Sequence, residues 1–176
     1  RIPVTLIIFL FFLDLAVFFL LENRFLVVIW AIVGLAPKAW RASTMRSTSF
    51  VATFRSPFLN RMLELVYAFH TGITSNAWIL HHNLGHHVNY LDQTKDESRW
   101  KDRGGLTMGA FRYTCMTALT GYLRAYRVGR LHPKYQRTFL AAGSIVTLLT
   151  AGLLWHNTFN ASVLFLIPML FGYITT

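Results

Sequence analysis

Four of the seven histidines of this chain stand within one segment of seven residues, 81–87, which reads HHNLGHH. Imidazole is neutral near pH 7 and binds iron, copper, zinc and nickel, so a cluster of this density first indicates a metal site. Buried imidazoles without partners are costly, and a shared metal ion is a simple common partner. The alternative is a purely structural cluster, which is how we interpret the isolated His132 and His156.

Helical spacing predicts which of these imidazoles can serve one site. If a helix begins near Arg61 and continues to Tyr90, His82 and His86 are four residues apart on one face, about 6 Å from each other. His87 then lies about 100° further round the helix, which favours a pair of metal ions over one. We therefore expect His82, His86 and His87 to be the metal ligands.

The two nearest remaining histidines are assigned differently. His81 points in a third direction on the same helix, so we expect it to take no part in the site. His70 stands eleven residues before His81 and cannot join the cluster if the helix is unbroken. Gly72 can break the helix, so the role of His70 stays open.

The residues between the histidines narrow the choice of metal. Zinc proteases use His-Glu-x-x-His with a glutamate as base, whereas Asn, Leu and Gly stand here. Haem in a membrane bundle is held by single histidines on facing helices, and not by a cluster on one helix. Iron bound by several imidazoles at a membrane surface fits better, since such a centre can activate oxygen against an unreactive C–H bond.

The elements that would position this site are membrane helices. The chain has 176 residues and is 54% hydrophobic, which is rare in a soluble domain of this length. Apolar runs predict an all-α integral membrane protein with two transmembrane hairpins, over residues 2–40 and 138–176. Lys38 and Trp40 extend the first hairpin to the membrane interface, and the third crossing runs from Phe139 to Trp155.

Charge predicts the orientation of the chain. Residues 38–137 contain 15 Lys and Arg against 5 Asp and Glu, and so carry the whole net charge of +10. By the positive-inside tendency this stretch faces the cytoplasm, where it is attracted to anionic lipid headgroups. We expect no nucleic-acid partner, because the basic residues alternate with membrane-type apolar runs and no recognition motif is present.

Residues 41–137 are expected to form cytoplasmic or interfacial amphipathic helices around the histidine tract. One apolar stripe contains Phe50, Phe54 and Phe58, with Arg46 beside it. A second stripe, with arginines around it, consists of Phe111, Cys115, Ala118, Tyr122 and Tyr126.

Five further polar residues are candidates for a functional role, each with a simpler alternative. Asn89 shares the face of His82 and His86 and could support a ligand, although a turn or cap role is the preferred interpretation. We expect the acidic residues Asp92, Asp96 and Glu97 to lie in a solvated loop. Asp14, within the first apolar run, is a functional suspect unless it faces Arg24 or a neighbouring helix.

The histidine tract resembles a histidine box of the membrane fatty acid desaturase superfamily. The resemblance rests on residues 82–87 (HNLGHH) and 88–92, on Trp78 before them, and on residues 96–100 after them, which are similar to bacterial members. The layout is also similar, with a membrane hairpin, a cytoplasmic helical stretch bearing histidines, and a second hairpin.

This resemblance implies a centre of two non-haem iron ions with about eight or nine histidine ligands drawn from three boxes. It also implies a fatty acyl substrate in the membrane, an electron donor such as a ferredoxin or a cytochrome b5-type protein, and a bacterial inner membrane with the box on the cytoplasmic side. Since only seven histidines are present, we expect this stretch to be part of a longer protein and unable by itself to hold the complete di-iron centre.

Two other functions stay open at this point. A hydroxylase of an alkane, sterol or carotenoid has the same architecture, because hydroxylation and desaturation differ only in substrate placement. A non-catalytic membrane protein that binds metal or lipid is the alternative from another class.

Overall fold

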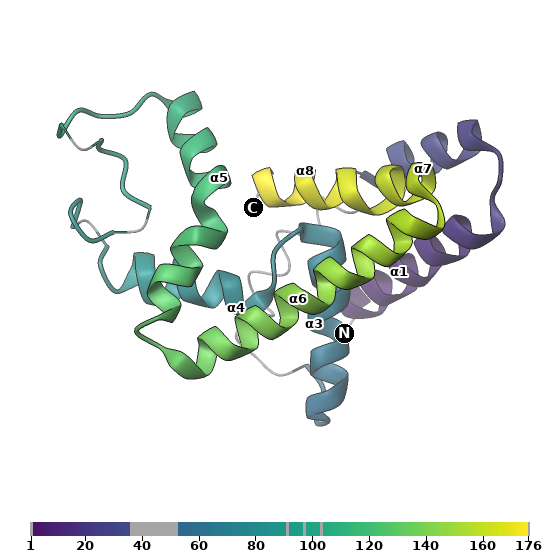
Figure 1. The fold of residues 1–176 in the computed structure, drawn as a ribbon, viewed down its shortest axis with the longest axis horizontal. Helices are drawn as coiled ribbons and strands as arrows, with labels where there is room; N and C mark the ends of the chain where they lie inside the picture. The colour runs from purple at the N-terminus through teal and green to yellow at the C-terminus, as the bar shows by residue number, and fades with distance from the viewer. Residues whose placement is uncertain (1, 36–52, 91, 97, 103, 176) are drawn as a thin grey trace. The chain divides into compact units, whose positions relative to one another are not determined.

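The computed structural model describes residues 2–35, 53–90, 92–96, 98–102 and 104–175. Within these ranges the regular elements are helices, apart from one isolated antiparallel bridge between Lys101 and Thr107, which confirms the all-α prediction. In chain order they are α1 (Ile2–Leu20), a helix over Arg24–Leu35, α3 (Pro57–Thr71), α4 (Ser75–Trp78), the π-helix η1 (Ile79–His87), α5 (Ala110–Gly129), α6 (Pro133–His156), α7 (Thr158–Ala161), the π-helix η2 (Ser162–Leu166) and α8 (Ile167–Thr175), drawn in Figure 1.

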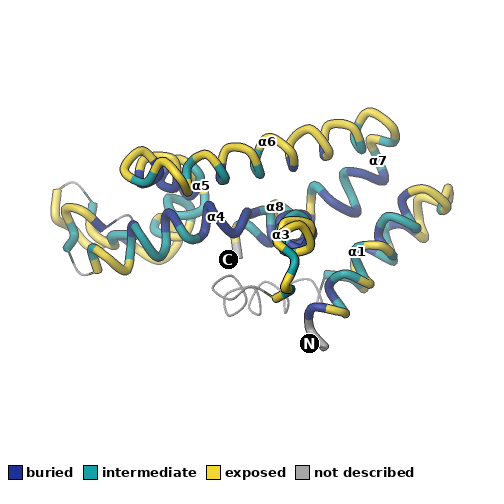
Figure 2. Tube along the Cα trace, turned by 90° about the horizontal axis from the view of Figure 1, so that it is seen from below, coloured by how far each residue is buried: buried dark blue, intermediate teal, exposed yellow. Residues whose placement is uncertain are grey.

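Among the described residues, only α6 is both long and apolar enough to cross a membrane, with a mean hydropathy of 1.7. It contains the expected third crossing and begins at Pro133, earlier than predicted. Figure 2 shows α6 exposed along most of its length. The helices over Val4–Leu20, Arg24–Leu35 and Thr158–Ile174 are apolar but shorter. The two-hairpin arrangement therefore stays a prediction, and its anchors Lys38 and Trp40 lie outside the described residues.

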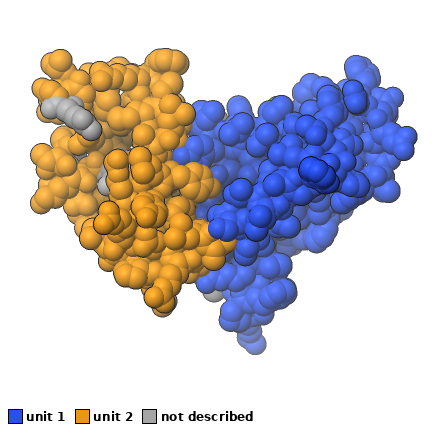
Figure 3. Space-filling view, viewed as in Figure 1, with its two compact units in different colours: residues 1–74, 142–176 blue, residues 75–141 orange. Residues whose placement is uncertain are grey.

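The chain divides into two compact units, which Figure 3 distinguishes by colour. Unit 1 consists of residues 1–74 and 142–176, and unit 2 of residues 75–141. The core of unit 1 joins α1, the Arg24–Leu35 helix, α3 and the C-terminal helices, and its buried members are Phe18, Val27, Ala31, Phe69, Ala161, Leu164 and Phe165.

Two polar side chains tie the elements of unit 1 together. Asp14 is buried in α1 and accepts a hydrogen bond of 3.0 Å from the indole Nε1 of Trp30 in the next helix. Its expected neighbour Arg24 lies instead over the ring of Phe159, 5.1 Å from the centroid. Asn160 is buried and donates through Nδ2 to the carbonyls of Phe18 and Leu21, at 3.2 and 3.1 Å. Asp14 thus faces a neighbouring helix, as one of the alternatives anticipated.

The expected continuous helix from Arg61 to Tyr90 is interrupted. Helix α3 begins after the N-cap Ser56 with Pro57 in its first turn, and it ends at Gly72. Gly72 has φ +66°, in the left-handed region that favours glycine, and its N–H donates to the carbonyl of Ala68 at 2.8 Å. The histidine tract therefore belongs to a separate helical segment that starts at Ser75.

Gly72 is also required because α8 approaches it closely. A Cβ atom on Gly72 would lie 2.0 Å from the carbonyl oxygen of Met169, and one on Gly172 would lie 2.8 Å from the carbonyl oxygen of His70. Two backbones meet here with no side chain between them, so the end of α3 is fixed against α8.

Unit 2 is built by α5 packing on η1. The buried side of α5 consists of small residues and one arginine: Gly121, Arg124, Ala125, Val128 and Gly129. Phe111 and Tyr126 of the predicted stripe are exposed on α5 and do not contribute to this buried side, so the placement of the stripe in the membrane surface stays a prediction. Small side chains, and not the large apolar ones, allow α5 to approach η1 closely.

The other predicted stripe is not one helix within the described residues. Phe54 lies in bends before α3, where the carboxamide of Asn60 binds its backbone N–H and carbonyl, both at 2.9 Å, whereas Phe58 lies in α3. Phe50 and Arg46 lie outside the described residues.

Candidate metal centre

The side chains of His82, His86 and His87 lie close to one another on η1. The ring centroid of His82 is 5.5 Å from that of His86 and 4.6 Å from that of His87, and the last two are 5.5 Å apart. Separations of this size are compatible with imidazoles that share an ion, because each metal–nitrogen bond is about 2 Å long.

The π-helical backbone explains why three rings meet. In an α-helix, residues five apart lie on different faces, which is why His87 was expected to point away from His82. A π-helix closes hydrogen bonds between residues five apart, so each turn takes up more residues and His87 returns to the face of His82. The expected second direction is therefore wrong, and these rings face one another within the described residues.

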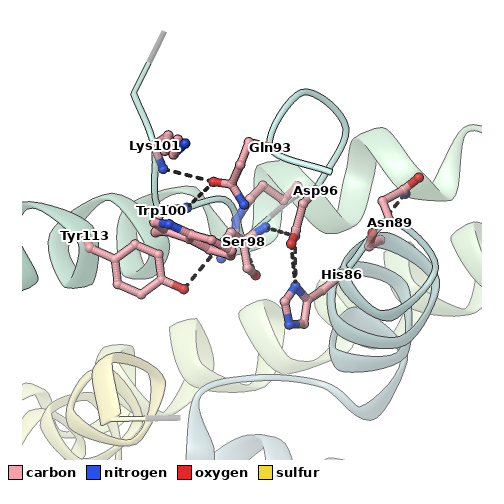
Figure 4. Close-up of polar contacts among 10 residues, drawn as sticks. His86, Asn89, Gln93, Asp96, Ser98, Trp100, Lys101 and Tyr113 are labelled. Atoms are coloured by element: carbon pink, nitrogen blue, oxygen red, sulfur yellow. Dashed lines mark hydrogen bonds and ion pairs between the residues drawn. The ribbon is translucent and has the colours of Figure 1, made fainter. Parts of the chain in front are cut away.

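The contact of Asp96 with the histidine tract was not anticipated from the sequence. Its carboxylate accepts a hydrogen bond from Nδ1 of His86, at 2.8 Å from Oδ1 and 3.0 Å from Oδ2. Figure 4 shows Asp96 directed at His86 from the loop after η1. The residue is only 3% exposed, so its assignment to a solvated loop was wrong.

The Asp96 contact determines what His86 can do. An ionised carboxylate only accepts hydrogen bonds, so Nδ1 of His86 carries the proton and Nε2 is left as the basic nitrogen. Ligating histidines in metalloproteins usually donate their other N–H to a carboxylate or a carbonyl, which orients the ring and raises its basicity. His86 has this arrangement.

The loop around Asp96 is well ordered by hydrogen bonds. The Thr94 hydroxyl and backbone N–H donate to Asp92 at 2.6 and 3.0 Å and lower the pKa of that carboxyl. Gln93 Oε1 accepts from the backbone N–H groups of Trp100 and Lys101, both at 3.1 Å (Figure 4). Asp92 thus faces outward in the loop, and Glu97 lies outside the described residues.

His81 makes a separate contact within the helix, and its absence from the site stays a prediction. It is buried, and its Nδ1 is 2.8 Å from the carbonyl of Ala77. Burial, with the positive charge of Arg124 as a second cause, lowers the pKa of His81 to about 4. The ring is therefore neutral at neutral pH.

Aromatic side chains lie against two of the three imidazoles, whereas His87 is exposed. The Trp78 indole lies against His82 with 4.3 Å between centroids, and Tyr90 meets His86 edge-on at 5.3 Å. Asn89 donates from Nδ2 to the carbonyl of Gly85 at 3.0 Å, a capping contact at the end of η1.

The remaining histidines have other surroundings. His70 is buried in unit 1, with Nε2 3.3 Å from the carbonyl of Ile7 and its ring edge-on to Phe11. His156 is exposed at the end of α6, beside the rings of Phe18 and Phe19. His132 lies in the turn before α6, where its carbonyl accepts from Gln136.

The donor set fits an iron ion in its chemistry. Among the described residues, no group of three or more His, Cys, Asp or Glu side chains is placed so that it could hold a metal ion as it stands. The rings of His82, His86 and His87 nevertheless neighbour one another, with centroids 4.6 to 5.5 Å apart, and His86 is oriented by Asp96. The carboxamide oxygen of Asn83, next to His82, is buried without a hydrogen-bond partner in this part of the structure, and an ion's bound water would satisfy such an acceptor.

Comparison with known proteins agrees with this chemistry. The model of the family described as fatty acid desaturase matches residues 25–176, which is most of the chain and includes the histidine tract. No curated protein and no solved structure matches the chain.

Proposed function

This chain belongs to the fatty acid desaturase family, and we propose that its histidine tract provides ligands to a non-haem iron centre that acts on acyl chains at a membrane surface. The family supports an oxidoreductase of lipid metabolism in general. Desaturation of a fatty acyl chain by oxygen and external electrons is the specific reaction that we propose.

The observation that carries the proposal is the meeting of His82, His86 and His87 on one helical segment, with a buried carboxylate behind one of them. Histidines that served only for packing would not require a buried carboxylate hydrogen-bonded to one of them. Since a buried Asp is costly unless it is hydrogen-bonded, Asp96 is best explained by what it does to His86.

Each residue then has a defined part. His82, His86 and His87 would hold the metal through imidazole nitrogens, while Asp96 fixes the ring of His86 and keeps its proton on Nδ1. Trp78 and Tyr90 limit the rotation of His82 and His86. Iron bound there would supply the oxygen chemistry that no side chain of the protein can provide.

Three imidazoles are too few for two iron ions. We propose that the complete centre holds two, with further ligands from histidines other than these three, in keeping with the family. The external electrons would come from a ferredoxin or a cytochrome b5-type donor, and the substrate from membrane lipid.

The proposed location is a membrane, with the histidine tract on its cytoplasmic side, as in a bacterial inner membrane. Helix α6 is the candidate span. Exposed cations lie just before it at Arg127 and Arg130 and in its first two turns at Lys134 and Arg137, and residues 104–176 contain no Asp or Glu. A cationic segment beside a membrane span is favoured on the side of the membrane whose lipid headgroups are anionic.

The test is production of unsaturated acyl chains in a bacterial host that expresses the full-length protein. His86→Ala should abolish double-bond formation, because it removes the ligand that Asp96 orients. His132→Ala is the matched control, since His132 lies in the same unit but outside the tract, and it should leave the product unchanged.

Fatty-acid methyl esters from each strain can be compared by gas chromatography and mass spectrometry. Unaltered unsaturation in the His86→Ala strain would exclude the ligand assignment. A hydroxylated product that disappears with His86→Ala would keep the metal centre but reassign the reaction to hydroxylation.

A further inference from the structure

Ser98 joins the carboxylate of Asp96 to helix α5. Its backbone N–H donates to Oδ1 of Asp96 at 2.7 Å, and the same oxygen is 2.8 Å from Nδ1 of His86. Oδ1 of Asp96 thus accepts two hydrogen bonds, and together they fix the orientation of the carboxylate. Figure 4 shows Ser98 beside Asp96, with His86 on the other side of the carboxylate.

Helix α5 holds Ser98 at two further atoms. The Arg124 guanidinium donates from one terminal nitrogen to the Ser98 hydroxyl at 2.9 Å, and the Tyr113 hydroxyl donates to the Ser98 carbonyl at 3.2 Å. All three polar atoms of Ser98 are therefore bonded: N–H to Asp96, hydroxyl to Arg124 and carbonyl to Tyr113.

Arg124 is placed for this contact and is not a surface cation. It is only 6% exposed, on the side of α5 that packs on η1, and its other terminal nitrogen donates to the carbonyl of Thr117 at 2.8 Å. The bond to Thr117 fixes the guanidinium along α5, so the direction in which it reaches Ser98 is set by the helix. A buried guanidinium is costly to retain, whereas Arg127 on the same helix is exposed.

We infer that Arg124 and Ser98 are positioning residues for His86. They hold the Asp96 carboxylate so that His86 keeps its proton on Nδ1 and presents Nε2 as the basic nitrogen. This inference deepens the proposed metal centre and rests on it for its purpose, but the tautomer of His86 can be measured with no metal present.

The alternative is that Arg124 and Ser98 only stabilise the fold of the loop. Both roles predict some loss of stability in variants, so stability does not separate them. Only the positioning role predicts that the tautomer of one histidine changes while the rest of the chain is unaltered. The nitrogen shifts of imidazole distinguish the two neutral tautomers.

The experiment records ¹⁵N spectra of the histidine side chains of the metal-free chain in detergent micelles, at mildly alkaline pH where imidazole is neutral. His86 is assigned from the spectrum of His86→Gln. The wild-type chain should show His86 with Nδ1 protonated, and Asp96→Asn should abolish that preference. Ser98→Ala and Arg124→Gln should each give a mixture of tautomers at His86, and Ser98→Thr, which keeps the hydroxyl, should restore the wild-type form.

The control is Arg127→Gln, which removes the same charge from an exposed position of α5 and should leave His86 unchanged. Ser98→Ala removes one half-buried oxygen atom, so it is the variant least able to disturb folding. A wild-type tautomer at His86 in both Ser98→Ala and Arg124→Gln would overturn the inference, as would the same change in Arg127→Gln.

A second titration separates this inference from the proposed function. Cobalt(II) is added to each variant, and its visible absorption bands report binding. Ser98→Ala should weaken binding about tenfold, the lower end of the effect known for groups that orient metal-bound histidines. If the His86 tautomer changes as expected but the chain binds no cobalt, the positioning role is supported and the metal centre is refuted. If the chain binds cobalt but the His86 tautomer is the same in all variants, the metal centre is supported and the positioning role is refuted.

Discussion

Substitution of Gly72 by alanine should be among the most destabilising single changes in unit 1, because two separate costs coincide. The first is conformational: at φ +66° an alanine adopts the left-handed region, which costs about 1–2 kcal/mol. The second is steric: the new Cβ would lie 2.0 Å from the backbone oxygen of Met169, which no side-chain rotation can relieve. Overpacking of this kind costs about 1–3 kcal/mol, so the expected total is about 2–5 kcal/mol.

Two other glycines of the same unit separate these costs. In Gly172→Ala the backbone is not in the left-handed region but the Cβ would lie 2.8 Å from the His70 carbonyl, so only the steric cost applies. In Gly143→Ala the Cβ would meet no atom within 4 Å, and alanine in the interior of α6 should stabilise the chain by up to about 1 kcal/mol.

The assay is unfolding in detergent micelles, followed by near-UV and far-UV circular dichroism during titration with sodium dodecyl sulfate. The expected order of stability is Gly143→Ala, then wild type, then Gly172→Ala, then Gly72→Ala. If Gly72→Ala unfolds at the same detergent fraction as Gly143→Ala, the contact between α3 and α8 is wrong.

Two further substitutions test the polar ties of unit 1 by the same unfolding titration. Trp30→Phe removes the indole donor from the buried Asp14 and should destabilise the chain by about 1–3 kcal/mol, whereas Trp155→Phe, at an exposed position, should have little effect; equal effects would refute the tie. Asn160→Leu keeps the number of side-chain heavy atoms but leaves the carbonyls of Phe18 and Leu21 without this donor, and should also cost about 1–3 kcal/mol; Asn23→Leu, at an exposed site, is a control for the polarity change, although it also removes a helix cap.

The metal ligands could be proposed from the sequence because their spacing is local. Helical proximity depends only on the separation of His82 and His86 along the chain, so a pattern of residue types is enough to relate them. The position of His87 could not be obtained in this way. Residues 79–87 form a π-helix, and the choice between α and π hydrogen bonding depends on packing against α5, for which the tract itself carries no signal.

Asp96 and Arg124 were missed for a different reason. Both are charged residues in surroundings that predict exposure, namely a polar loop and a basic helix. Arg124 did carry a usable signal, since Gly121, Ala125 and Val128 share its side of the helix and mark the side that packs. Asp96 lies in the segment 96–100 that carries the family resemblance, but nothing in the sequence indicates its burial, which results from a loop folding back on η1 over ten residues.

The membrane helices show which features composition alone does not predict. Apolar runs correctly indicated helices, but the length of each helix depends on where turns interrupt it. Asn23 caps the helix after α1 by accepting from two backbone N–H groups, and Asn157 caps α7 by accepting from one. These caps determine where the apolar helices over Arg24–Leu35 and Thr158–Ile174 begin.

The most direct test of the account is metal binding by the chain itself. Cobalt(II) titration of the wild-type chain should give visible bands typical of nitrogen ligation, and the triple variant with alanine at His82, His86 and His87 should lose them. A second triple variant, with alanine at His70, His132 and His156, has the same number of histidines and should bind as the wild type does. Equal cobalt binding by the two triple variants would contradict the claim that the histidine tract is the metal centre.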